Sequence, residues 1–184
     1  MSELKYEYLP KYTYDDYKHW EGKWELIHGI PYAMSPAPRI EYQLVSGKIN
    51  FQLLTLLKNC NKCKALLPVD WRVNTEEEDD IILQPDNLVI CSDVKGNYIT
   101  EAPELIFEII SPSSAMKDRF TKYQIYESQK VKYYVIVEPE SKIAEIFELK
   151  DDNYIKITET KNDTVKFELD EDCKIDFNFS EIWI

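Results

Sequence analysis

The stretch Leu105-Ile106-Phe107-Glu108-Ile109-Ile110 decides the fold, because it has the apolar pattern of a fully buried strand with one acidic residue inside it. A second acidic residue, Asp86, stands in Gln84-Pro85-Asp86, just ahead of the apolar run Leu88-Val89-Ile90. Carboxylates are seldom buried without a partner or a metal, since desolvating an unpaired charge is very costly. If the two strands pair, Asp86 and Glu108 can reach one face of the sheet and share a Mg²⁺ or Mn²⁺ ion, which prefers oxygen ligands.

A helix is predicted to follow over residues 115–129, with Ser111-Pro112-Ser113-Ser114 supplying its N-cap. It carries Lys122, whose ammonium group could stabilise negative charge developing at a phosphate or orient the attacking water. Asp118 and Tyr126 lie four residues before and after Lys122, so all three share one helix face. Two interpretations of Asp118 stay open: an exposed ion pair with Lys122, or a residue that orients Lys122 toward the metal. Two carboxylates and a lysine together indicate metal-dependent hydrolysis of a phosphodiester bond.

The composition is that of a globular chain of one domain, with 184 residues, of which 44% are apolar and 30% charged. No stretch approaches the roughly 18 to 20 apolar residues that span a membrane, and the N-terminus lacks an apolar signal core. We therefore expect a cytoplasmic protein. The net charge of −12 argues against a general nucleic-acid binder. It leaves a nuclease open, because clustered acids can serve a metal.

Four cysteines are present, two of them in Cys60-Asn61-Lys62-Cys63, which looks like half of a zinc site. No second pair of Cys or His stands at a suitable spacing, since Cys91 and Cys173 are isolated. We therefore expect reduced thiols near a helix end, as is usual in a cytosolic protein.

The remaining pattern predicts a single domain over residues 1–184. A capping box at Thr13 and Asp16 begins a short helix, and two strands flank a turn at Gly29. Apolar residues at helical spacing predict a long amphipathic helix over residues 39–58, after a break at residues 35–38. The expected strands are 65–74, 81–91, 104–111 and 131–137, then an antiparallel meander of 143–149, 153–158 and 164–169 and a short tail, with a solvated acidic loop at 76–80. This order favours an α/β (α+β) fold: a mixed β-sheet flanked by helices, with extra C-terminal antiparallel strands.

Several motifs occur along the chain in a characteristic order. They are Trp24-Glu25-Leu26-Ile27-His28-Gly29, Met34-Ser35-Pro36-Ala37-Pro38, Gln84-Pro85-Asp86, Glu108-Ile109-Ile110-Ser111-Pro112-Ser113-Ser114, Asp118, Lys122, Tyr126 and Tyr133-Tyr134-Val135-Ile136-Val137-Glu138-Pro139. As an ordered set they resemble the Uma-type restriction endonucleases, a group in the PD-(D/E)XK nuclease superfamily. The resemblance covers about residues 12–150. It implies a restriction-endonuclease-like core with a metal-dependent phosphodiesterase site.

The resemblance also implies roles for individual residues. Asp86 and Glu108 take the two acidic positions of the motif, and Glu25 could add a third carboxylate to the Mg²⁺ or Mn²⁺ ion. The usual lysine two residues after the second acid is absent, because Ile110 stands there, and Lys122 from the following helix substitutes for it. Gln43 matches a glutamine of the first long helix, but the histidine that commonly precedes it is replaced by Tyr42. This departure leaves open whether this copy is fully active.

Three interpretations of the function follow. The first is a Mg²⁺-dependent endonuclease that acts on DNA as a homodimer, since cutting two strands requires two sites. The second is a catalytically inactive relative that serves as a binding or assembly module, and the third is hydrolysis of another phosphate ester. Asp70 is expected to support the structure rather than the chemistry, and Gln84 could orient the substrate or simply end a strand. A modest basic rim is expected from Arg39, Lys48, Lys117, Arg119 and Lys130.

Overall fold

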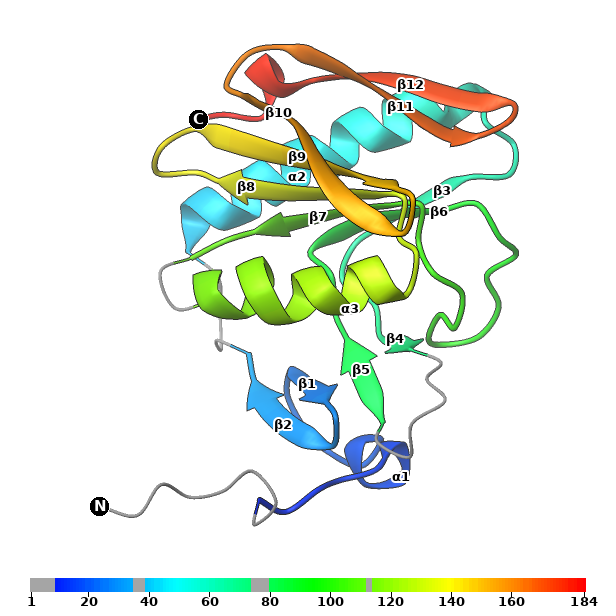
Figure 1. The fold of residues 1–184 in the computed structure, drawn as a ribbon, viewed down its shortest axis with the longest axis vertical. Helices are drawn as coiled ribbons and strands as arrows, with labels where there is room; N and C mark the ends of the chain where they lie inside the picture. Colours follow the sequence, from blue (N-terminus) through cyan, green and yellow to red (C-terminus); the bar gives the residue numbers. More distant parts are fainter. Residues whose placement is uncertain (1–8, 35–38, 74–79, 112–113) are drawn as a thin grey trace.

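A mixed sheet of six strands forms the centre of the molecule in the computed structural model, which describes residues 9–34, 39–73, 80–111 and 114–184 (Figure 1). The strand order is β10-β9-β8-β7-β6-β3. Of these neighbours only β7 and β8 run parallel, and the other pairs are antiparallel. The strands are β3 (Lys64–Leu66), β6 (Asn87–Ile90), β7 (Leu105–Ile109), β8 (Tyr133–Glu138), β9 (Ile143–Lys150) and β10 (Asn153–Thr160).

Helices cover both faces of this sheet. Alternate side chains of β7 and β8 point to opposite faces, and each set packs against a different helix. Phe107 and Val135 pack with the inner side of α2 (Ile40–Leu56), which continues into a 3₁₀ turn, η2 (Leu57–Asn59). Ile106 and Ile136 pack on the other face with α3 (Tyr123–Ser128). The expected fold, a mixed sheet flanked by helices, is therefore confirmed. No helix in the described ranges is long and apolar enough to cross a membrane.

A second sheet lies below the first in Figure 1 and has the order β2-β1-β5-β4. It contains the predicted hairpin around Gly29, and the short helix α1 (Tyr14–Tyr17) packs against it through Tyr17. Thr13 and Asp16 form the predicted capping box of α1. The strands are β1 (Trp24–Ile27), β2 (Ile30–Ala33), β4 (Trp71–Val73) and β5 (Ile81–Leu83).

Two predicted strands are each divided between the two sheets. Residues 65–74 become β3 and β4, with Pro68 between them, and residues 81–91 become β5 and β6, with Pro85 between them. Proline has no N–H to donate to a strand ladder, so a continuous strand ends at each of these positions. The chain thus passes between the sheets at Gln84-Pro85-Asp86. The predicted break at residues 35–38 and the acidic loop up to residue 79 lie outside the described residues.

The C-terminal residues form a further hairpin, β11 (Thr164–Asp170) with β12 (Cys173–Asn178), followed by the 3₁₀ turn η4 (Phe179–Glu181). The expected meander is therefore wrong in part: β9 and β10 join the main sheet, β11 pairs only with β12, and the expected tail is a strand. Phe167 and Phe177 pack their rings against Phe107 of β7, which fixes the hairpin over the α2 side of the core.

The expectation of reduced thiols is also wrong. Cys60 pairs with Cys173, and Cys63 pairs with Cys91, so the cysteines form two disulfides. The first disulfide joins the end of η2 to β12 across 113 residues of sequence. Such a pairing depends on the long-range fold, which the spacing of cysteines does not reveal. Because disulfides are rare in cytosolic proteins, the pairing runs against the cytoplasmic location expected from the sequence.

Candidate active site

The edge between the two sheets brings Asp86 and Glu108 together. Asn87 pairs with Phe107 in the antiparallel ladder of β6 and β7, and one step along this register sets Asp86 opposite Glu108. The backbone N–H of Ile109 donates to Asp86 Oδ2 at 2.8 Å, which fixes the carboxylate against β7. The sequence expectation that these carboxylates share one region rested on the pairing of the two strands, and the strands do pair.

Lys122 lies at the centre of a buried ionic cluster. Its Nζ is 2.7 Å from Glu25 Oε1, 2.8 Å from Glu108 Oε1 and 3.6 Å from Asp118 Oδ1. Lys122, Glu108 and Asp118 are at most 3% exposed, and Glu25 is fully buried. Charges are rarely buried in this way unless they are paired, and each member of this cluster has an opposite charge beside it. The interpretation of Asp118 and Lys122 as an exposed ion pair is therefore wrong.

A wall of aromatic side chains fixes the cluster from the α3 side. Tyr126 donates its hydroxyl to Glu108 Oε1 at 2.6 Å, and its ring stacks on Trp71. Tyr134 donates its hydroxyl to the backbone carbonyl of Asp118 at 2.9 Å. Tyr126 and Tyr134 are fully buried, so both hydrogen bonds are shielded from water; the first restricts the rotation of Glu108 and the second fixes the backbone at Asp118. Tyr126 therefore both packs on Trp71 and hydrogen-bonds to Glu108 within the site.

The segment that carries Lys122 is a π-helix, η3 (Lys117–Lys122), rather than the regular α-helix expected over residues 115–129. A second lysine at its start, Lys117, forms an ion pair with Glu25 Oε2, while Lys122 contacts Glu25 Oε1. At 3.6 residues per turn, residues five apart would point about 140° away from each other, and the wider π turn aligns them. Sequence reasoning placed Lys117 only in a basic rim, because helical periodicity contains no signal for this contact.

A polar network supports Glu25 from the small sheet. The backbone N–H of Gln84 donates to Glu25 Oε1 at 3.1 Å, and its side-chain amide donates to Asp70 Oδ1 at 2.6 Å. Tyr17 donates its hydroxyl to the same Asp70 oxygen at 3.0 Å. Asp70 thus fixes the side chain of Gln84, and the backbone of Gln84 in turn contacts Glu25 of the cluster. This agrees with the structural role expected for Asp70.

The electrostatic environment shifts the pKa values of Asp86, Glu108 and Glu25 in different directions. Burial raises the pKa of Asp86 to about 6, against the opposing effect of Lys122. Burial likewise raises the pKa of Glu108 well above its usual value, although Lys122 again opposes it. For Glu25 burial also acts to raise the pKa, but Lys122 and Lys117 outweigh it and the pKa is lowered. Burial acts to lower the pKa of Lys122, yet Glu108 and Glu25 hold it well above the usual value.

The donor set fits a hard divalent cation. When all four carboxylates (Glu25, Asp86, Glu108 and Asp118) are ionised, they carry two more charges than Lys117 and Lys122 neutralise, and a bound divalent ion would balance this difference. Carboxylate oxygens are the ligands that Mg²⁺ and Mn²⁺ prefer. Among the described residues no three His, Cys, Asp or Glu side chains are already arranged to hold a metal ion. In this arrangement the Lys122 ammonium occupies the space between Glu25 and Glu108.

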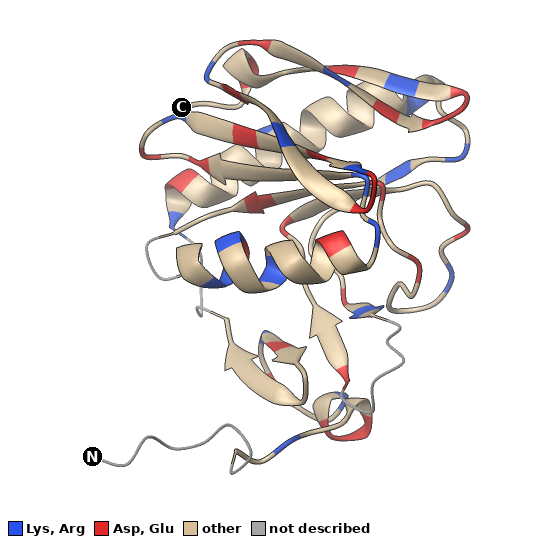
Figure 2. Ribbon diagram, viewed as in Figure 1, with Lys and Arg blue, Asp and Glu red and all other residues tan. Residues whose placement is uncertain are grey.

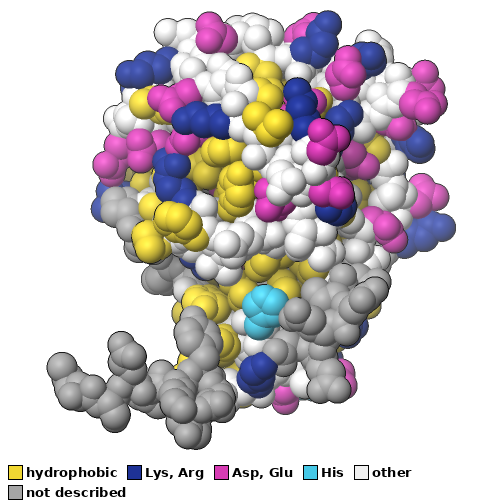
Figure 3. All heavy atoms as spheres, in the orientation of Figure 1, with side chains coloured by type: hydrophobic (Ala, Val, Ile, Leu, Met, Phe, Trp, Pro, Cys, Tyr) yellow, Lys and Arg dark blue, Asp and Glu magenta, His cyan; other side chains and the backbone are white. Residues whose placement is uncertain are grey.

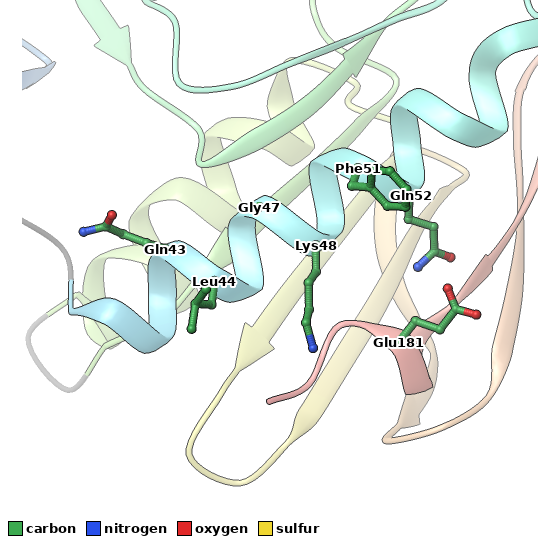
Figure 4. A pocket seen from close by; sticks show the side chains of 7 residues that line it. All are labelled: Gln43, Leu44, Gly47, Lys48, Phe51, Gln52 and Glu181. Atoms are coloured by element: carbon green, nitrogen blue, oxygen red, sulfur yellow. The ribbon is translucent and has the colours of Figure 1, made fainter.

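Gln43 lies elsewhere. It is exposed on α2, beside a hollow lined by Leu44, Lys48 and Glu181 (Figure 4). No residue of the carboxylate cluster lines this hollow. The supporting role of Gln43 stays a prediction, since α2 packs on the opposite face of the main sheet from Tyr126 of the cluster. The prediction for Gln43 rested on the family resemblance alone, and no pattern in the sequence around Gln43 supported it independently.

The expected basic rim does not form around the site. Arg39 pairs with Glu140, Arg119 with Glu145 and Lys130 with Asp152, while Lys48 donates to the carbonyl of Trp183. Figures 2 and 3 show Lys and Arg interspersed with Asp and Glu on the face in view. Of the five basic residues expected in the rim, Lys117 alone contacts the cluster.

Comparison with known proteins gives two findings. The model of the Uma2 family, described as "Putative restriction endonuclease", matches residues 13–178. The fold is similar to a crystal structure described as a putative nuclease belonging to DUF820 from Anabaena variabilis ATCC 29413, with a TM-score of 0.71 and 11% sequence identity. That similarity covers 92% of this chain and 96% of the other. No curated protein matches the sequence.

Proposed function

Because the chain belongs to the Uma2 family, whose members are described as putative restriction endonucleases, we propose that it is a metal-dependent endonuclease that hydrolyses phosphodiester bonds in DNA. The observation that carries the proposal is the ammonium of Lys122 buried between Glu25 and Glu108, with Asp86 on the adjoining strand. Perturbed ionisable groups of this kind gather at functional sites.

Asp86, Glu108 and Glu25 are the residues that would hold a Mg²⁺ or Mn²⁺ ion, through carboxylate oxygens that the protein has already desolvated. When bound, such an ion supplies Lewis-acid polarisation of a phosphodiester oxygen. Tyr126 keeps Glu108 in one orientation through its hydroxyl, and Ile109 does the same for Asp86 through its backbone N–H. The protein thereby prepares the acidic ligands before the substrate arrives.

Lys122 and Lys117 would act on the charge of the substrate. A phosphodiester gains negative charge in the transition state, and a fixed ammonium group in a water-poor site stabilises that charge strongly. Lys122 is held rigidly by three carboxylates. The side chain of Lys117 is 21% exposed, so it is the lysine that an approaching phosphate could contact from solvent. We assign Lys122 to the reacting phosphate and Lys117 to positioning of Glu25 and of the substrate backbone.

The proposal is tested with supercoiled plasmid in the presence of Mg²⁺ or Mn²⁺. We expect nicked or linear DNA from the wild type and none from Asp86→Ala or Glu108→Gln. The matched control is Glu104→Gln, because Glu104 is a half-buried carboxylate that accepts from the backbone of Cys91, outside the cluster. Loss of cutting in the control as well would show that the assay reports folding rather than chemistry.

Intact plasmid with correctly folded wild type would contradict the proposal. Adding single-stranded DNA, RNA and a small phosphodiester to the same assay separates the wrong substrate from an inactive site. If no phosphate ester is cleaved and Mn²⁺ does not raise the melting temperature, the chain is a catalytically silent relative that serves as a binding or assembly module.

A further inference from the structure

Helix α2 is apolar on both of its sides. One side packs into the core through Tyr42, Val45, Ile49 and Leu53. The other side faces solvent, yet it carries four large apolar residues with high exposed fractions: Ile40 (77%), Leu44 (48%), Phe51 (74%) and Leu54 (52%). A helix that is apolar all round is ordinarily covered all round, so the outer side of α2 has the composition of an interface.

The exposed residues follow the spacing of a helix–helix seam. Ile40, Leu44, Gly47, Phe51 and Leu54 are separated by four, three, four and three residues, which is the repeat of a coiled coil. We call these five residues the α2 seam. At 1.5 Å per residue the seam extends for about 21 Å along the helix.

Gly47 makes the centre of the seam hollow. A Cβ atom added at Gly47 would meet nothing within 4 Å, so its missing side chain leaves open space. The hollow at this position has a volume of about 390 Å³ and is bordered by Leu44 and Phe51, with Lys48, Gln52 and Glu181 on its polar side (Figure 4). It has the character of a hole that accepts a side chain of a neighbouring helix.

We propose that the occupant of the α2 seam is a second copy of this chain, with the two α2 helices antiparallel. In this arrangement Phe51 of the partner subunit fills the hollow at Gly47, and Leu44 packs against Leu54 of the partner subunit. The symmetry repeats both contacts, so each large residue of the inner seam meets a complementary position. The α2 seam is therefore complementary to the same seam of a second copy.

Charge also favours a second copy in this orientation. The chain carries −12 overall, so two copies repel each other at most of their surfaces. Residues 39–58 carry a smaller local net charge of +2, from Arg39, Lys48 and Lys58 against Glu41, so two copies that meet there face only a weak like-charge repulsion, which ion pairs across the seam can offset. The antiparallel register further brings Glu41 next to Lys58 of the partner subunit, at both ends of the seam. Neither residue forms an ion pair with another described residue.

The proposed dimer leaves the carboxylate cluster open. The α2 helix packs on one face of the main sheet, and α3 with Tyr126 packs on the other. The inference therefore stands independently of the proposed function, although two sites in one particle would suit the cutting of both strands of a duplex.

Light scattering coupled to size exclusion tests the dimer across the micromolar range of protein concentration. We expect the wild type at twice 21.8 kDa and Phe51→Asp at 21.8 kDa, because an aspartate in the seam would be buried without a partner. The matched control is Ile155→Asp on β10, which changes an exposed apolar residue away from the seam and should stay dimeric. Circular dichroism of each variant establishes that it is folded.

A charge exchange tests the register. Glu41→Lys or Lys58→Glu alone sets like charges opposite each other at both ends of the seam, and each should raise the dimer dissociation constant about tenfold. The double exchange should restore the wild-type value. A wild type that stays monomeric overturns the proposal and leaves the seam to a different protein. A dimer that tolerates Phe51→Asp places the interface elsewhere, and single exchanges without effect overturn the antiparallel register.

Discussion

Lys117 and Lys122 lie five residues apart in the chain, and their ammonium groups contact the two oxygens of one carboxylate, that of Glu25. The π-helical turn of η3 is the device that makes this possible. Such turns are rare and concentrate at functional sites, since they cost helix hydrogen-bond geometry. In this protein the π turn allows two lysines to neutralise the fully buried carboxylate of Glu25.

Replacing Lys122 by methionine should destabilise the metal-free protein by about 3–5 kcal/mol, because Glu25 and Glu108 would be left as buried charges without their shared partner. Millimolar Mn²⁺ should recover much of this loss, so the variant should show a larger thermal shift than the wild type. Turnover at saturating metal should fall by about 10²–10³-fold. Thermal melts and plasmid cleavage measure the two effects. Wild-type turnover in Lys122→Met would show that the lysine has no catalytic role.

Replacing Lys117 by methionine should cost less, about 1–3 kcal/mol, since Glu25 keeps the ion pair with Lys122. The pKa of Glu25 should rise, because burial is then opposed by one lysine instead of two. Denaturant unfolding across pH measures both changes. Lys130→Met, which removes a lysine from an exposed ion pair, is the control and should have no measurable effect.

The π geometry itself can be tested by moving the lysine along the chain. In a Lys117→Met background, Met116→Lys retains the composition and net charge but places the cation outside the aligned position. We expect no recovery of stability. Full recovery would show that a lysine anywhere near the start of η3 satisfies Glu25.

The contribution of Asp86 to the stability of the metal-free protein should fall as the pH rises from 3.8 to about 6. The pKa of Asp86 is raised in the folded state, so the folded protein holds this proton more tightly than the unfolded chain does. The contribution is fully present below the unfolded value of 3.8 and is lost as the pH rises through about 6. Glu108 acts in the same direction, since its pKa is also raised. Asp86→Asn should flatten this part of the stability profile measured by urea unfolding.

Metal binding should show the opposite dependence on pH, because protons and Mn²⁺ compete for the same carboxylate. The thermal shift with Mn²⁺ should increase as the pH rises through about 6. A shift that is constant over this range would exclude Asp86 as a ligand. Calorimetric titration at two pH values, with proton release recorded in two buffers, gives an independent measurement.

The two disulfides should contribute unequally to stability. In the chain-entropy model, the link between Cys60 and Cys173, 113 residues apart, is worth about 5 kcal/mol. The link between Cys63 and Cys91, 28 residues apart, is worth about 3.5 kcal/mol. Cys173→Ser should therefore lower the urea midpoint more than Cys91→Ser does. Four reactive thiols in the denatured protein without reductant would show that the pairs are not formed.

The sequence predicted those parts of the fold that depend on local periodicity. The apolar runs around Phe107 and Val135 predicted buried strands, and the helical spacing from Tyr42 to Leu57 predicted α2. The strand over Cys173–Asn178 was missed although its signal was present, since Cys173, Ile175 and Phe177 alternate with polar residues. The division of two strands at Pro68 and Pro85 could have been recognised from the prolines alone.

The site was predictable to the extent that its residues are unusual in their local context. Glu108 and Asp86 interrupt apolar patterns, so they were found without knowledge of the fold. The contact of Lys117 with Glu25 joins positions 92 residues apart through a π turn, and neither the distance nor the turn has a signature in periodicity. The cysteine pairs were missed for the same reason, because their partners are chosen by the tertiary structure.

The passage of the chain between the two sheets at Gln84-Pro85-Asp86 has a consequence for the timing of activity. Glu25 comes from a strand of the small sheet, whereas Glu108 comes from the main sheet and Lys122 from the helix beside it. A chain in which only one sheet has formed therefore carries an incomplete carboxylate cluster. If the chain is the proposed nuclease, a molecule whose two sheets have not yet docked has no complete site and should not cleave its substrate.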